Sequence, residues 1–396
     1  LREFGWAAEM PETLRKKISR ERLTTQEEAP GDLTEHLLKE VGHSAKKRPP
    51  LLFCQQVLEI ASSEKIFIKD RDAFLIASIV TCLFWNPMLG KRIGRQDVED
   101  AVVYFFIIAR LAAFSVIDHK KNSMWKKLAF GKEFHPTTSF TENVFKILLN
   151  RKPTEIELTE LQMLLGLTVT NGPGTLSAKG AKESVSARNH ISLAFTGFLC
   201  NTGLAHGGNG FEAVDYLMQQ FKKANLSDPG DLNSNINLTL LANKAAKTYR
   251  TYKTEQKETG HLNYKRIPCI NHPVFKGNQV NIDPREDYIR KQIEKMGIRN
   301  IFLDFYHELV KELHNEGVTN NVFCVNVDAV LAVITLKLIW YDLKSRRMSM
   351  HQAQDLVFLL FLIGRAIGVA AEIADHRNRG QDMDCRTPQS ELKFVL

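Results

Sequence analysis

Three short polar stretches interrupt the helical pattern of this 396-residue chain, and each contains one residue that can move a proton. They are Ala-His-Gly-Gly-Asn-Gly around His206, Ile-Asn-His-Pro around His272, and Asn-Val-Asp ending at Asp328. Glycines directly after His206 remove side chains where a helix should begin, so a ligand could approach the backbone N–H groups and the imidazole together. These two histidines and one aspartate form a candidate acid/base set.

Helices are expected to position this set, because apolar residues recur at three- and four-residue spacing from Leu33 onward. Asp283-Pro284 should cap a helix that continues through Met296. The polar stretch from Lys223 to Gly260 is interpreted as a solvated surface. No alternating strand pattern occurs, so the sequence predicts an all-α fold. Other expected helices cover 52–60, 73–83, 101–116, 141–149, 155–167, 184–204, 302–315, 329–343 and 353–374, with one after His206 ending at Phe221.

Composition narrows the class of partner. The chain has 53 basic and 45 acidic residues, but the basic ones are scattered without interleaved aromatics, which favours a small anionic ligand over nucleic acid. Its six cysteines are far apart without a Cys-x-x-Cys pair, so we expect no metal site and a reducing, cytoplasmic location. The apolar runs 73–85, 101–109 and 356–363 are too short to cross a bilayer, and no membrane association is expected.

The N-terminal segment resembles part of a different enzyme. Residues 1–20 are similar to the closing segment of the α subunit of succinyl-CoA synthetase, and the chain lacks an initiating Met. Residues 1–24 are therefore interpreted as the tail of an upstream CoA-ligase domain. Residues 25–32, which contain Gln-Glu-Glu-Ala-Pro-Gly, are interpreted as a linker.

The order and spacing of five motifs resemble the citrate synthase superfamily. The motifs are AHGGNG at His206, NHPVFKGNQVNIDPR at His272, NVD at Asp328, GRAIG at Arg365 and CRTPQS at Arg386. The final segment is particularly similar to the end of ATP-citrate lyase. This resemblance implies a large helical domain over 33–205 and 341–396 and a smaller helical domain over 206–340.

The resemblance also implies a role for each site residue. Asp328 would exchange a proton with the methyl carbon of a CoA thioester, His206 would hold the enol oxygen, and His272 would polarise the keto oxygen. Such an enol needs a base and an oxygen stabiliser acting together. Planar guanidinium groups suit the carboxylates of citrate or oxaloacetate. The implied substrate-binding residues are Arg285, Arg365, Arg386 and Asn171, the last standing where the family usually has histidine.

Coenzyme A, as acetyl-CoA or citryl-CoA, is the cofactor that the resemblance implies. The segment after Arg266 resembles the family's CoA-binding loop, with the expected contacts Pro268, Ile270, Asn271, Phe275 and Lys276. No metal is expected in this chain. ATP and Mg would act only in the presumed upstream domain, because no Gly-x-x-x-x-Gly-Lys-Ser/Thr loop occurs here.

Three functions remain open from the sequence. The first is a citryl-CoA lyase module of an ATP-citrate-lyase-like enzyme, which cleaves citryl-CoA to acetyl-CoA and oxaloacetate. The second is a stand-alone citrate or methylcitrate synthase, and the third is a weakened oligomerising scaffold for a CoA ligase. The resemblance further implies a homodimer or homotetramer, in which Arg386 completes the active site of a partner subunit.

Overall fold

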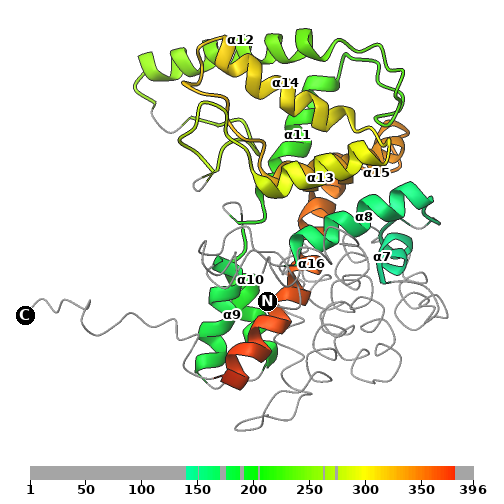
Figure 1. Ribbon diagram of the computed structural model, residues 1–396, viewed down its shortest axis with the longest axis vertical. Coiled ribbons are helices and arrows are strands. Elements are labelled where there is room, and N and C mark those ends of the chain that lie inside the picture. Colours follow the sequence, from blue (N-terminus) through cyan, green and yellow to red (C-terminus); the bar gives the residue numbers. More distant parts are fainter. Residues whose placement is uncertain are drawn as a thin grey trace, which may run out of the picture. The chain divides into compact units, whose positions relative to one another are not determined.

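The computed structural model describes residues 140–149, 151–169, 175–187, 191–203, 206–261, 264–272 and 275–379 (Figure 1). Within these ranges the regular elements are helices, and extended segments meet only in isolated bridges. The expectation of an all-α fold is therefore confirmed. The predicted segment 1–24, the linker 25–32, the helices expected before residue 140, and both Asn171 and Arg386 lie outside the described residues.

The helices of the described part are labelled α7 to α16 in Figure 1. None of them is both long enough and apolar enough to cross a membrane. Their bounds are α7 Phe140–Leu149, α8 Glu155–Thr168, α9 Leu176–Ser186, α10 Ile191–Cys200, α11 Asn209–Phe221, α12 Leu238–Glu258, α13 Pro284–Lys295, α14 Ile301–Asn315, α15 Val327–Lys344 and α16 Met350–Arg379.

The chain divides into two compact units. The first unit comprises Leu1–Pro153, Leu165–His206 and Phe361–Leu396, and the second comprises Thr154–Leu164 and Gly207–Leu360. The division passes through α8 and α16 and separates His206 from Gly207. The domain boundaries expected from the sequence stay a prediction.

Side-chain caps define where the helices of the second unit begin. Asn237, Asp283, Asn300 and Asn326 each accept a hydrogen bond from a backbone N–H group in the first turn of the helix that follows. Such caps satisfy donors that have no partner inside the helix, and each typically contributes about 1 kcal/mol. The start of α15, which carries Asp328, is therefore fixed locally by Asn326.

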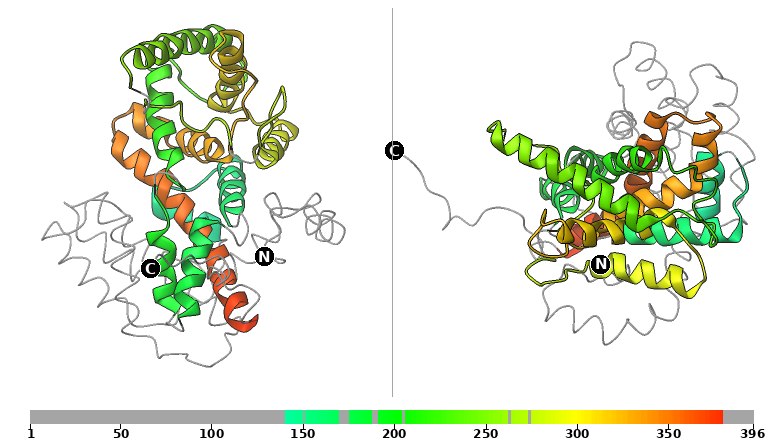
Figure 2. Two further views of the ribbon diagram at one scale, coloured as in Figure 1. Left: turned by 90° about the vertical axis from the view of Figure 1, so that its left-hand side faces the viewer. Right: turned by 90° about the horizontal axis from the view of Figure 1, so that it is seen from above.

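An apolar core holds the second unit together. α12 packs against α14, and α11 packs against α15 (Figures 1 and 2). The Phe221 ring meets Phe302 edge-on at 5.0 Å between centroids, and Phe302 meets Trp340 at 5.2 Å. α15 is buried along most of its length, which makes it a firm support for a residue in its first turn.

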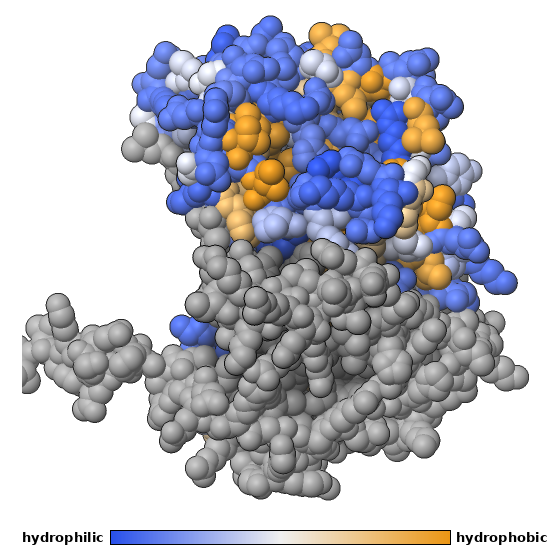
Figure 3. All heavy atoms as spheres, viewed as in Figure 1, coloured by the Kyte–Doolittle hydropathy of each residue, from blue (hydrophilic) through white to orange (hydrophobic). Residues whose placement is uncertain are grey.

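The polar stretch that the sequence assigned to a solvated surface contains a helix of 21 residues, α12. Its buried residues are Ala242, Ala245 and Ala246, so most of its side chains face solvent. Figure 3 shows that the visible face of the second unit is mainly hydrophilic, with a few apolar clusters. Because so few apolar residues are buried, the helical periodicity of this stretch is weak.

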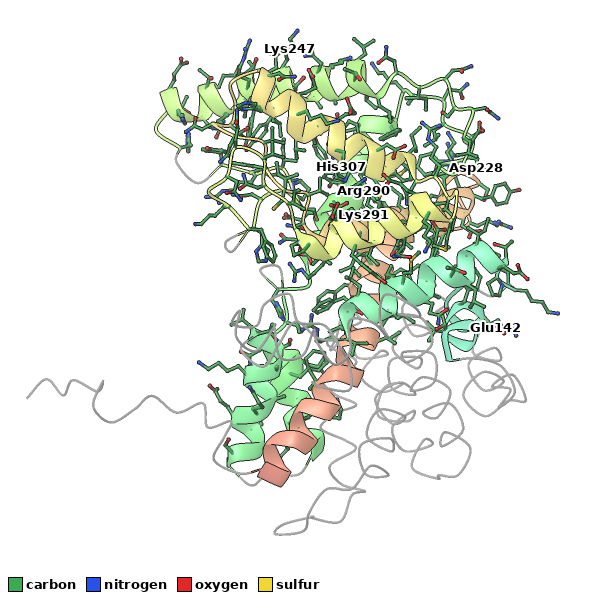
Figure 4. The ribbon with its side chains drawn as sticks, in the orientation of Figure 1. Glu142, Asp228, Lys247, Arg290, Lys291 and His307 are labelled. Atoms are coloured by element: carbon green, nitrogen blue, oxygen red, sulfur yellow. The ribbon has the colours of Figure 1, made fainter. Side chains whose placement is uncertain are left out.

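Helices α13 and α14 are joined by polar contacts. His307 on α14 lies 2.9 Å from Glu286 on α13, and Figure 4 labels His307 together with Arg290 and Lys291 of α13. Arg290 and Lys291 both form ion pairs with Asp287 on their own helix. These contacts support the helix that carries Arg285 in its first turn.

In the first unit, the helix expected over 184–204 is instead the end of α9 followed by α10. The two helices pack against each other at glycines, since a Cβ added at Gly180 would lie 2.6 Å from the Gly197 carbonyl oxygen. Gly197 is one of the small residues that suggested close packing with a partner helix. It therefore makes such a contact within the chain.

Candidate active site

Asp328 is the second residue of α15 and is partly buried. The Asn326 side chain accepts a hydrogen bond from the Asp328 backbone N–H at 3.0 Å, so the cap holds this residue directly. A carboxylate in the first turn is favoured by the partial positive charge of a helix N-terminus. The sequence forms this arrangement because a cap residue precedes a long apolar helix.

The beginning of α11 lies against the beginning of α15. The Asn209 side chain donates from Nδ2 to Oδ2 of Asp328 at 3.3 Å. The next residue is Gly210, where an added Cβ would lie 3.3 Å from the Asp328 carbonyl oxygen and 2.8 Å from a Val357 methyl group. Glycine at this position therefore lets the two helices approach closely enough for the amide to reach the carboxylate.

A hydrogen bond from Cys269 holds the backbone of Asn209 beside Asp328. Its thiol donates to the Asn209 carbonyl oxygen at 3.3 Å, and its side chain is 3% exposed. Burial raises the pKa of this thiol well above its ordinary value, and the negative charges of Asp328 and Glu212 raise it further. Cys269 is thus a neutral hydrogen-bond donor and not a thiolate nucleophile.

The loop that carries His272 pairs with the segment leading to Asp328. Asn271 donates its backbone N–H to Cys324 O at 2.8 Å, and Asn326 donates its own to Cys269 O at 3.0 Å. The Asn326 side-chain amide also donates to Asn271 O at 3.3 Å. Through these contacts, His272 and Asp328 are held on adjoining segments of the second unit.

His272 is a neutral base at neutral pH. Its ring stacks on Phe275 with centroids 4.7 Å apart, and the side chain is half-buried. Burial lowers the pKa of this imidazole, and the positive charge of Arg285 lowers it further, whereas Asp283 acts in the opposite direction. A neutral imidazole can accept a proton at one nitrogen and donate from the other.

Arg285 lies in the first turn of α13 with a guanidinium that is fully buried. Its Nε and Nη2 groups donate to the two oxygens of Asp283 at 2.9 Å and 2.8 Å. The same guanidinium lies over the Phe275 ring, 5.4 Å from its centroid. Phe275 is therefore in contact with two predicted site residues, His272 and Arg285.

His206 belongs to the first unit. It closes a tight turn with Gly203, in which each backbone N–H donates to the carbonyl of the other residue, at 3.0 Å and 2.9 Å. Its Nε2 lies 2.9 Å from the Ser177 hydroxyl, and its ring meets Phe361 edge-on. Burial, followed by the positive charge of Arg365, lowers the pKa of His206 to about 4. His206 is therefore neutral at physiological pH.

Arg365 lies in the part of α16 that belongs to the first unit, with an exposed fraction of 3%. Its guanidinium lies over the Phe361 ring at 5.2 Å, and the same ring contacts His206. Phe361 thus links two predicted site residues of the first unit.

The structure places the predicted site residues in two groups. His272, Arg285 and Asp328 come together in the second unit, and His206 and Arg365 come together in the first. Of the predicted CoA contacts, Pro268 is buried, Ile270 and Phe275 are partly buried, and Asn271 and Lys276 are exposed.

Sequence reasoning assigned no role in the site to four polar residues that support these groups. Asn209 and Cys269 contact the region of Asp328, Ser177 contacts His206, and Asp283 binds Arg285. Only Asp283 gave a signal, as the expected cap before Pro284. Within the described ranges, no cluster of three or more His, Cys, Asp or Glu residues could hold a metal ion.

Comparison with solved structures shows the fold. The chain is similar to citrate synthase from Thermoplasma acidophilum, in its ternary complex with carboxymethyl coenzyme A and oxaloacetate, at 15% identity and a TM-score of 0.58 over 93% of this chain and 87% of that one. Citrate synthase from Pyrobaculum aerophilum matches at 11% identity and a TM-score of 0.55, over 91% and 80%.

A looser likeness, with a TM-score of 0.47 and 18% identity, links the chain to citryl-CoA lyase from Hydrogenobacter thermophilus over 65% of this chain and 84% of that one. No curated protein matches the sequence. The family profile described as "Citrate synthase, C-terminal domain" matches residues 76–384, which is well over half of the chain. The chain therefore belongs to the citrate synthase C-terminal domain family.

Proposed function

We propose that the chain cleaves citryl-CoA to acetyl-CoA and oxaloacetate, as the lyase module of an ATP-citrate-lyase-like enzyme. The observation that carries the proposal is the pairing of the His272 loop with the segment that ends in Asp328. This pairing supports acid/base chemistry on both sides of one carbon–carbon bond. The cleavage direction rests on the resemblance of the final segment to the end of ATP-citrate lyase.

The proposed cleavage needs two proton movements. Neutral His272 accepts the proton of the citryl hydroxyl as the carbon–carbon bond breaks and the keto group of oxaloacetate forms. The bonding electrons move to the thioester, giving an enol or enolate whose oxygen takes a hydrogen bond from neutral His206. Protonated Asp328 then supplies the proton that completes the acetyl methyl group. Atoms and electrons balance without an oxidant, and the enzyme is restored when His272 releases its proton to solvent and Asp328 takes one up.

The arginines at the positions implied by the citrate synthase resemblance would bind the substrate. We propose that Arg285, Arg365 and Arg386 bind the carboxylates, with Asn171 beside them. The loop containing Pro268, Ile270, Asn271, Phe275 and Lys276 would bind coenzyme A. A dimer or tetramer, in which Arg386 reaches the partner's site, and an upstream CoA-ligase domain belong to the same proposal.

The proposal is tested with the purified 396-residue chain and citryl-CoA, following oxaloacetate through its reduction by malate dehydrogenase. Asp328→Asn and His272→Ala should each lower kcat at least about a hundredfold, as expected for a positioned acid/base group. Asp342→Asn, at the other end of α15, and His261→Ala, at an exposed position, are the matched controls.

Three outcomes would overturn the proposal. Near-normal turnover by Asp328→Asn would remove the acid/base assignment. Net citrate formation from acetyl-CoA and oxaloacetate without detectable cleavage of citryl-CoA would instead identify a synthase, and absence of turnover in both directions would favour a scaffold.

A further inference from the structure

We propose that Asn209 is a positioning residue for the Asp328 carboxylate, a role that rests on the proposed function, in which Asp328 exchanges the proton of the thioester α-carbon. The Asn209 side chain donates from Nδ2 to Oδ2 of Asp328 at 3.3 Å. An amide N–H is a donor that does not titrate. It can donate to Oδ2 at every pH and so fixes the orientation of the carboxylate.

The position of the Asn209 backbone is set by its neighbours. It is the first residue of α11, its carbonyl oxygen accepts the buried Cys269 thiol at 3.3 Å, and Gly210 lies against the Asp328 backbone. These contacts join the beginnings of α11 and α15. These contacts hold the Asn209 amide in one position relative to the Asp328 carboxylate, as a positioning residue requires.

The contact is not an ordinary helix cap. The cap of α11 is Gly208, and no side-chain hydrogen bond forms there. The Asn209 amide reaches across to α15, although the two residues are 119 positions apart in the sequence. If Asn209 served only to begin a helix, aspartate would serve as well, because a negative charge in the first turn is favourable.

Asn209→Asp and Asn209→Ala separate these two roles. The Asp variant keeps the size of the side chain and suits the helix start, but it places a second carboxylate against Asp328. We expect it to keep the melting temperature of the wild type and to lose about a hundredfold in kcat at pH 7. The Ala variant should lose about tenfold, consistent with removal of a hydrogen bond to a charged group. KM for citryl-CoA should change less than about twofold in both, because the lost contact acts on the Asp328 carboxylate and not on substrate binding.

The pH profile of kcat separates the two roles, because loss of a purely structural residue would not shift it. An N–H donor favours the ionised carboxylate, so removing it should raise the pKa of Asp328. Because Asp328 must be protonated to complete the cleavage, the alkaline limb of kcat should shift to higher pH by about one unit in Asn209→Ala, and further in Asn209→Asp. Within the described part of the chain, the titratable groups coupled to this contact include the Cys269 thiol, the Glu212 carboxylate and the Tyr306 hydroxyl, and all three stay unchanged in these variants. Asn233→Asp adds the same charge at an exposed loop position of the second unit and is the control.

The results distinguish the two proposals. If Asp328→Asn abolishes turnover but both Asn209 variants keep the wild-type kcat and pH profile, the positioning role is overturned and the proposed function stands. A loss of kcat that follows a fall in melting temperature, with no shift of the alkaline limb, also overturns it. If Asp328→Asn stays active, the proposed function falls and the positioning role falls with it.

Discussion

Asp283 and Arg285, two residues apart in the sequence, form an ion pair whose side chains are 0% and 1% exposed. Besides the guanidinium, Asp283 accepts the backbone N–H of Arg285 at 3.0 Å and that of Val327 at 3.2 Å. One carboxylate therefore joins the first turn of α13 to the first turn of α15, one residue before Asp328. This contact places the predicted carboxylate-binding arginine and the predicted base on one rigid support.

Asp283→Asn should destabilise the protein strongly. The variant removes the negative charge beside a buried guanidinium, and breaking such a pair typically costs about 3–5 kcal/mol. Asp342→Asn is the matched control, because its partner Arg347 is 59% exposed and surface pairs contribute about 1 kcal/mol or less. Urea unfolding followed by circular dichroism measures both free energies of unfolding. Equal losses in the two variants would contradict the structural role of Asp283.

His206 should make the protein less stable as the pH falls. Its pKa is lowered from 6.5 to about 4, so between these values the unfolded chain binds a proton that the folded protein does not. The free energy of unfolding therefore decreases as the pH falls through this window. Between pH 7 and pH 4.5, we expect wild type to lose about 2 kcal/mol more than His206→Gln, since each pKa unit corresponds to about 1.4 kcal/mol.

Urea unfolding of both proteins at the two pH values measures this difference. In an NMR titration, the ring C2 proton signal that disappears in His206→Gln should move at a pH of about 4. A signal that titrates near 6.5 would contradict the buried neutral state of this imidazole, and so would identical pH dependence of unfolding in the two proteins.

Helices with a strong apolar pattern and a clear cap could be predicted from the sequence. The helix expected over 329–343 is α15, Val327–Lys344, because a continuous apolar run follows the cap Asn326. The helix expected to run from its cap Asp283 through Met296 is α13, Pro284–Lys295. The apolar periodicity was weak for α12, because its buried face consists of three alanines. The apolar pattern was misleading at α9 and α10, which are two helices that pack against each other at Gly180 and Gly197.

Candidate site residues could be chosen by type and motif, but their supporting contacts could not. The hydrogen bond from Asn209 to Asp328 joins residues 119 positions apart, and Ser177 and His206 are 29 apart. No local pattern encodes such pairs, because they depend on how two helix ends meet after folding. The capping role of Asp283 was visible in Asp-Pro-Arg, whereas its contact with Val327 was not.

The contact between α9 and α10 should tolerate no side chain at Gly197. A Cβ there would lie 2.5 Å from the Gly180 carbonyl oxygen and 2.3 Å from the Ser184 hydroxyl, and a backbone oxygen cannot move aside without separating the helices. Gly197→Ala should therefore lower the free energy of unfolding by about 1–3 kcal/mol, the usual cost of overpacking. Gly230→Ala is the matched control, because the nearest atom to its Cβ is a side-chain carbon of Lys337, at 3.1 Å, and not a backbone atom. That variant should change stability by about 0.5 kcal/mol or less. Urea unfolding compares the two, and a Gly197→Ala protein as stable as Gly230→Ala would mean that α9 and α10 lie farther apart than this contact requires.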